Sequence, residues 1–248
     1  MALAYDNSAS ASLSSGASSI TSASWAIAGS DRILIASAYS GAGTPAQATG
    51  MKWGGSGGVA LTEIGTGVTA NTYFTGSAWK LIAPAAASQT LYGSWGSTQD
   101  ELAIGGISLT GADQTTGVRT GGSASAAAQA WSPTATVNVT TVADDVVVDS
   151  VSGNSTGNSY LTIAVGAGQT SRQEIDLVSA TNWGWGMSTE VATGTSVTMS
   201  WTINGVGGAD AGWIIKAVPV IPAGAAAPSE AFLTMPPMIP GGWNTGRW

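Results

Sequence analysis

Residues 196–204, SVTMSWTIN, contain the pattern that decides the fold class. Large apolar side chains occupy every second position: Val197, Met199, Trp201 and Ile203. Small polar side chains lie between them: Thr198, Ser200 and Thr202. Successive side chains of a β-strand point to opposite faces, so this period of two predicts a strand with one face in a core.

More strand candidates occur along the chain, separated by clusters of Gly, Ser, Asn and Thr. The most apolar are RILIASAY (32–39), DDVVVDSV (144–151) and AGWIIKAV (211–218). Weaker candidates are YFTGSAWKLI (73–82), QTLYGSWG (89–96), ELAIGGISL (101–109) and TATVNVTT (134–141). No segment has the apolar stripe of a helix. A total of roughly ten to fourteen strands predicts an all-β fold, a two-sheet antiparallel β-sandwich of jelly-roll type over residues 1–219.

The strand pattern ends at Pro219. Residues 220–248 contain five prolines, which interrupt β-ladders and favour an extended chain. The same stretch holds large apolar side chains: Phe232, Leu233, Met235, Met238, Ile239, Trp243 and Trp248. We expect an extended C-terminal arm that binds neighbouring subunits through these residues. The alternative is an arm that folds back over its own sandwich.

The composition excludes several function classes. Charged residues make up 8% of the chain, against about 25% in an average protein, and the net charge is −7. Without a basic patch we expect no nucleic-acid binding. The chain has no histidine and no cysteine, which removes His-based triads, disulfides and nearly all zinc sites. We expect no cofactor.

The sequence contains neither a signal peptide nor a membrane-spanning stretch that we can identify. Its start, MALAYDNSAS, lacks the basic segment and apolar run of a secretion signal. No run of about 18 apolar residues occurs. We therefore expect a protein that is made in a host cytoplasm and has no membrane partner.

Trp183 and Trp185, in NWGWGMS, are the most distinctive internal pair. Two residues apart on a strand, they point the same way. Paired indoles on one face favour a core or a subunit interface, where Trp is enriched, and the alternative is a platform for a glycan.

Two groups of carboxylates are candidates for chemistry. Glu174 and Asp176 share one face of a predicted strand at a spacing of about 7 Å, which suits a glycosidase pair, although a solvated strand face explains them better. Asp144, Asp145 and Asp149 are a candidate calcium site, but Asp is also favoured in the turn that precedes a strand.

The stretch DRILIASAYS, followed by GMKWGGSGGVALTEIGT, resembles a β-sandwich domain that recurs in phage virion proteins and bacterial surface proteins. In that family an NRLL strand precedes a hairpin of the form V-Y-G-G-x-x-L-T. The likeness continues in order through WKLIAPAAASQTLYGSW, ISLTGADQTTGVRT, DDVVVDSV, GAGQTSR, SVTMSWT and GWIIKAVP, and so covers most of residues 24–219. The resemblance implies a β-sandwich and provides no catalytic residues, and the Pro-rich arm lies outside it.

Taken together, these features predict a non-enzymatic structural protein of a phage virion. We expect it to decorate or cement the capsid as a homo-oligomer, with its arm on neighbouring virion subunits. The alternative is a glycan-binding module of a tail fibre or a cell surface, with Trp183 and Trp185 as its platform. A glycoside hydrolase that uses Glu174 is a third interpretation.

Overall fold

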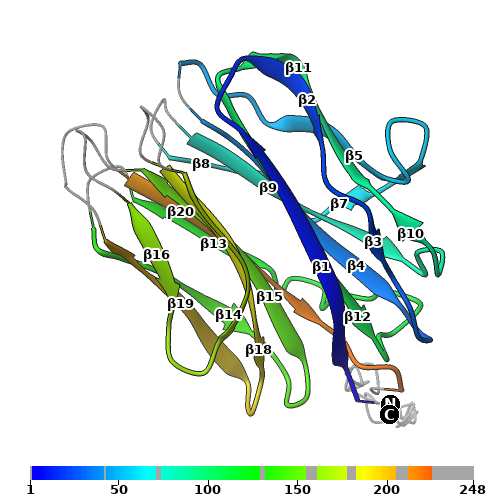
Figure 1. Ribbon diagram of the computed structural model, residues 1–248. Coiled ribbons are helices and arrows are strands. Elements are labelled where there is room, and N and C mark those ends of the chain that lie inside the picture. The colour runs from blue at the N-terminus through cyan, green and yellow to red at the C-terminus, as the bar shows by residue number, and fades with distance from the viewer. Residues whose placement is uncertain are drawn as a thin grey trace, which may run out of the picture.

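The computed structural model describes residues 2–41, 43–70, 74–128, 132–154, 161–177, 183–204 and 212–224. These residues form twenty β-strands and no helix, and every strand pairing is antiparallel (Figure 1). No helix long and apolar enough to cross a membrane is found in the described part of the chain.

The N-terminal half of the chain folds into two main sheets. The inner N-terminal sheet contains, in order, β1 (Ala4–Leu13), β12 (Glu101–Thr110), β4 (Ile33–Gly41), β9 (Phe74–Ile82) and β7 (Thr62–Glu63), and β8 (Val68–Ala70) also pairs with β9. The outer N-terminal sheet contains β2 (Ala17–Thr21), β11 (Leu91–Gln99), β5 (Ala48–Trp53) and β6 (Val59–Ala60). Two short strands, β3 (Trp25–Ala26) and β10 (Ser88–Gln89), form a separate pair.

The C-terminal half repeats this arrangement. Its inner sheet contains β13 (Ala124–Ala128), β20 (Gly212–Val220), β15 (Val146–Asn154), β18 (Trp183–Val191) and β17 (Thr170–Leu177). Its outer sheet contains β14 (Thr134–Thr140), β19 (Ser196–Asn204) and β16 (Thr162–Val165).

Both halves have the strand order of a jelly roll. In the N-terminal half, the first, eighth, third and sixth principal strands form one sheet (β1-β12-β4-β9). The second, seventh, fourth and fifth form the other (β2-β11-β5-β6). The orders β13-β20-β15-β18 and β14-β19-β16 reproduce this topology, without a counterpart of β6. The chain is therefore two jelly rolls in tandem.

The two jelly rolls pack through their inner sheets, which gives a stack of four sheet layers (Figure 1). Separate apolar cores fill the spaces between outer and inner N-terminal sheets, between the two inner sheets, and between inner and outer C-terminal sheets. The inner sheets are covered on both faces, so β4 and β20 are buried along their whole lengths. This explains why their sequences lack the alternation that β19 has.

Contacts across the central core follow an approximate twofold relation between the halves. β4 faces β15, β9 faces β20, and the edge strands β1 and β17 meet at one side while β8 and β13 meet at the other. Two glycines allow the sheets to come close. A Cβ at Gly105 on β12 would overlap the Trp185 indole, and one at Gly76 on β9 would lie 2.6 Å from Cδ1 of Ile214.

The prediction of an all-β antiparallel sandwich of jelly-roll type is confirmed. The structure differs in the number of layers, because the region predicted to form one two-sheet sandwich contains two sandwiches. The body also extends past the predicted boundary at Pro219. β20 includes Val220, and residues 221–223 bond to the connection between the halves.

We expect Gly105→Ala to destabilise the protein, because the added methyl group would overlap the Trp185 ring in the closed central core. Overpacking of this kind costs about 1–3 kcal/mol of unfolding free energy. Denaturant titration would measure it. Gly194→Ala is the matched control, since no atom lies within 4 Å of a Cβ there. Equal stabilities of the two variants would contradict the close packing at Gly105.

Candidate interaction surface

Trp183 and Trp185 lie in the central core, not on the surface. Their exposed fractions are 0% and 1%, and the Trp183 ring centroid is 5.0 Å from that of Tyr39 on β4. Neither indole face is accessible to a sugar ring, so the alternative prediction that this pair forms a glycan platform is wrong. The core interpretation of this pair is the one that the structure supports.

The carboxylates considered for catalysis and calcium binding have separate environments. Glu174 is exposed on β17, and the side chain of Asp176 lies outside the described residues. Asp144 occupies a turn with a φ of 72°. Asp145 is buried, and its carboxylate accepts two hydrogen bonds from the Arg119 guanidinium, at 2.6 and 2.7 Å. Among the described residues, no three His, Cys, Asp or Glu side chains are grouped so that they could hold a metal ion.

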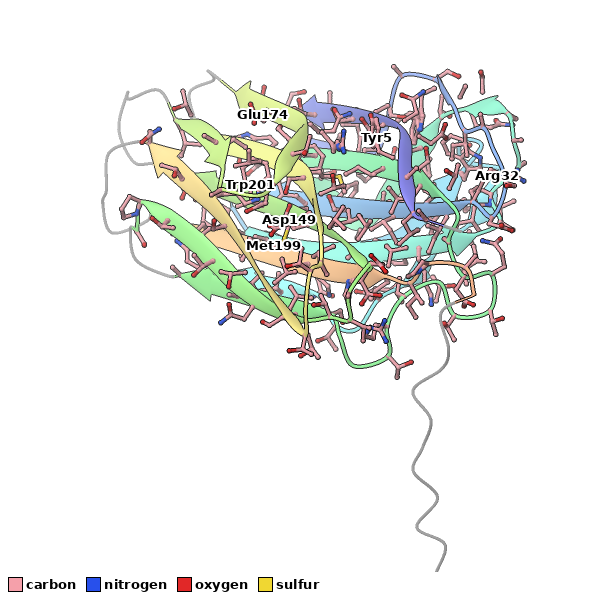
Figure 2. The ribbon with its side chains drawn as sticks, turned by 90° about the horizontal axis from the view of Figure 1, so that it is seen from below. Tyr5, Arg32, Asp149, Glu174, Met199 and Trp201 are labelled. Atoms are coloured by element: carbon pink, nitrogen blue, oxygen red, sulfur yellow. The ribbon has the colours of Figure 1, made fainter. Side chains whose placement is uncertain are left out.

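A buried polar network around Asp149 ties the inner and outer C-terminal sheets together. Oδ1 of Asp149 accepts hydrogen bonds from the backbone N–H and the hydroxyl of Ser188 on β18, at 3.0 and 2.6 Å. Oδ2 accepts one from the indole N–H of Trp201 on β19, at 2.8 Å. Gln169 completes the network, since its amide donates to the Ser188 hydroxyl and its Oε1 accepts from the backbone N–H of Ser200. Figure 2 labels Asp149 on β15 and Trp201 on β19, the two side chains that the hydrogen bond from the indole N–H joins between the sheets.

The Asp149 carboxyl has a pKa raised from 3.8 to about 6. Burial is the main cause, the charge of Glu190 adds to it, and the hydrogen bonds from Ser188 and Trp201 oppose it. From the sequence, Asp149 was predicted only as part of a candidate calcium site. In the sequence, Asp149 is a lone Asp inside an apolar strand. This pattern predicts a buried carboxylate that needs hydrogen-bond donors from within the protein.

The outer face of the C-terminal outer sheet is an uncharged polar surface. β14, β16 and β19 contain no charged residue. Most of the side chains that point outward are exposed and carry a hydroxyl or an amide group: Thr134, Thr136, Asn138, Thr140, Thr162, Ser196, Thr198, Thr202 and Asn204. The predicted burial of Val197, Met199, Trp201 and Ile203 on the other face is confirmed. Little charge would have to be desolvated if another subunit packed on this surface.

The point at which the chain leaves the body is fixed by hydrogen bonds. After β20, the N–H of Ile221 donates to the carbonyl of Gly117, and the N–H of Ala223 donates to the carbonyl of Gly111, at 3.0 and 2.7 Å. The seven arm residues predicted to bind a partner, from Phe232 to Trp248, lie outside the described residues. The last described residues, 221–224, therefore lie against the connection between the two jelly rolls.

A comparison of the chain with protein-family models, curated proteins and solved structures finds no match.

The raised pKa of Asp149 predicts how stability changes with pH. Its folded-state pKa lies above the unfolded value, so protonation favours the folded state, and this contribution is lost as pH rises from about 4 through about 6. The difference from 3.8 corresponds to about 3 kcal/mol. Most of this difference falls between pH 4 and pH 7, so we expect the wild type to lose about 2–3 kcal/mol of stability relative to Asp149→Asn over that range.

Denaturant titrations of both proteins at the two pH values would measure the effect. Asparagine cannot accept all the hydrogen bonds that the Asp149 carboxylate accepts, so the variant also loses some unfolding free energy. This loss is the same at both pH values. Glu174→Gln, which removes an exposed carboxylate, should keep the wild-type pH dependence. A constant difference between the wild type and Asp149→Asn would contradict the raised pKa.

Proposed function

We propose that this protein is a non-enzymatic structural component of a phage virion. It decorates or cements the capsid, and it assembles as a homo-oligomer through its C-terminal arm. The two jelly rolls form the body, and the arm connects that body to its neighbours in the particle.

The observation that carries this proposal is the fixed exit of the chain. Hydrogen bonds hold Ile221 and Ala223 to the connection between the jelly rolls. A further 24 residues follow Gly224, and they contain two tryptophans and five other large apolar side chains. A body that holds the base of such a segment presents it to a partner from a defined position.

The surface of the body also supports a role in assembly. Its outer C-terminal sheet is uncharged, and the whole chain has only seven Lys and Arg. A polar face without charges can form a close contact with another subunit and remain hydrated when it is unoccupied. The resemblance to virion β-sandwich domains supports a role in a phage particle, and the hydrogen-bonded exit of the chain supports a role in assembly for the segment that follows.

Deletion of residues 225–248 tests the proposal. We expect the full chain to sediment as an oligomer and the deleted chain to sediment as a monomer with an intact body. The cut after Gly224 preserves the hydrogen bonds of Ile221 and Ala223, so the body should keep its unfolding temperature. Sedimentation equilibrium gives the masses.

A full-length control separates the effect of the arm's length on assembly from the effect of its apolar side chains. In it, the seven large apolar arm residues are replaced by serine. This control should also be a monomer. A deleted chain that sediments as the same oligomer as the full chain would contradict the proposal.

A further inference from the structure

Edge strands of the described sheets differ in their protection against added strands. Natural sheets protect their edges with charges, bulges, prolines or short strands. β1 carries Asp6 and a register shift, and β17 carries Arg172, Glu174 and a register shift. The edge strands β2, β6, β7, β8, β13 and β16 have five residues or fewer. β14 has seven residues, a regular register, no charge and no proline.

The hydrogen-bond register of β14 shows which of its backbone groups face away from β19. The N–H of Ile203 donates to the carbonyl of Pro133, and the N–H of Thr141 donates to the carbonyl of Thr195. In an antiparallel pair, bonded and unbonded residues alternate. The odd-numbered residues of β14 therefore bond to β19, and the even-numbered ones direct their N–H and C=O groups to the opposite side.

Two of these even-numbered residues present open backbone groups. The N–H and C=O of Thr134 are satisfied by the hydroxyl of Ser132. Within the described part of the chain, no hydrogen bond reaches the N–H or C=O groups of Thr136 and Asn138, and both residues are exposed. Such an edge accepts an extended peptide as an additional strand.

The arm contains a segment of matching length. Residues 229–235, SEAFLTM, lie between Pro228 and Pro236 and contain no proline, so seven residues are available to pair with the seven of β14. As a strand, the segment would place Ala231, Leu233 and Met235 on one face. Below this edge, the alanines of β13 line the core between the two C-terminal sheets with small, partly buried side chains. Because these alanines are only partly buried, an added strand could cover them further.

The position of the exit favours a different copy of the chain as the donor. Ala223 is bonded to Gly111, which follows β12 of the inner N-terminal sheet. β20 itself belongs to the inner C-terminal sheet, one layer from β14, and Pro219 lies near the end of β14, because a Cβ at Gly122 would be 2.7 Å from Cγ of Pro219 and 3.1 Å from the carbonyl oxygen of Thr140. The hydrogen bonds of Ile221 and Ala223 then lead the chain away from this edge, toward the N-terminal half. Within one copy, residues 225–228 span at most about 17 Å and would have to reverse this direction to bring residue 229 to the edge of β14.

We propose that residues 229–235 of one copy add to the free edge of β14 in a second copy, as a fourth strand of its outer C-terminal sheet. This inference rests on the proposed function, because it names the acceptor of the arm. The backbone pairing supplies the strand's position, and the apolar side chains of the segment extend the core below it.

Proline substitutions on both partners test the pairing by sedimentation of the full-length protein. Ala231→Pro together with Thr234→Pro removes one backbone N–H from each side of the segment, so one of the two faces β14 in either strand direction, and all seven large apolar residues are kept. This double variant should weaken assembly at least about tenfold, without affecting the folded body. Ala226→Pro, outside the segment, should assemble like the wild type. Thr136→Pro removes a donor that does not bond to β19, so it should fold and fail to assemble, whereas Thr136→Val should do both.

Cross-linking identifies the donor, since the chain has no cysteine of its own. The single variants Asn138→Cys and Thr234→Cys are mixed and treated with a short bis-maleimide. A cross-linked heterodimer identified by mass spectrometry supports the proposal. A cross-link that forms only within a chain carrying both substitutions overturns it in favour of the chain's own arm, and no cross-link in either case overturns it as well.

The failure of this inference is distinguishable from the failure of the proposed function. A wild type that is monomeric overturns both. If the wild type is an oligomer, and this oligomer is unchanged by the Ala231→Pro/Thr234→Pro double substitution and by Thr136→Pro, the strand addition is overturned. Assembly through other contacts of the arm would then remain as the proposed function.

Discussion

The face-to-face packing of the two inner sheets is the contact on which the rest of the molecule depends. Each inner sheet has apolar side chains on both faces, so neither jelly roll can leave its inner sheet in water. Large side chains from one half fit over glycines of the other, as Trp185 does over Gly105 and Ile214 over Gly76. The tandem jelly rolls therefore behave as one body with a shared core. The approximate twofold relation of the contacts makes the interface resemble that of a symmetric dimer formed within one chain.

This stacking also determines what the body offers to a partner. The outer sheets have one buried and one exposed face, and in the C-terminal half the exposed face carries hydroxyl and amide groups without charge. The Asp149 network holds β19 to β15 and β18 from within, because one carboxylate accepts hydrogen bonds from both Ser188 and Trp201. The edge at β14 and the hydrogen-bonded exit of the chain at Ile221 and Ala223 thus belong to the same rigid framework.

Much of the fold could be predicted from the sequence, because burial on one face produces an alternation that is visible in β19. The long strands β4, β15 and β20 could also be located, since their apolar runs are bounded by turn residues. The duplication could not, because equivalent strands such as ILIASAYSG and VVVDSVSGN share a burial pattern and few identical residues. Trp183 and Trp185 alternate with glycine on a strand that is covered on both faces, and a period of two cannot distinguish a covered face from an open one. The environment of Asp149 depends on Gln169 and Trp201, which come from distant parts of the chain.

The central claim is that the body assembles by accepting the arm of another copy at the edge of β14. Hydrogen exchange of the backbone amides at this edge is the most direct test. The amides of Thr136 and Asn138 would be followed in the full-length protein over a range of concentrations. In dilute solution these N–H groups have no partner in the described body, so they should exchange rapidly. As the protein assembles, their exchange should slow together with the increase in mass, while the amides of β4 stay protected throughout. Exchange that remains rapid at Thr136 and Asn138 in the assembled state would contradict the account.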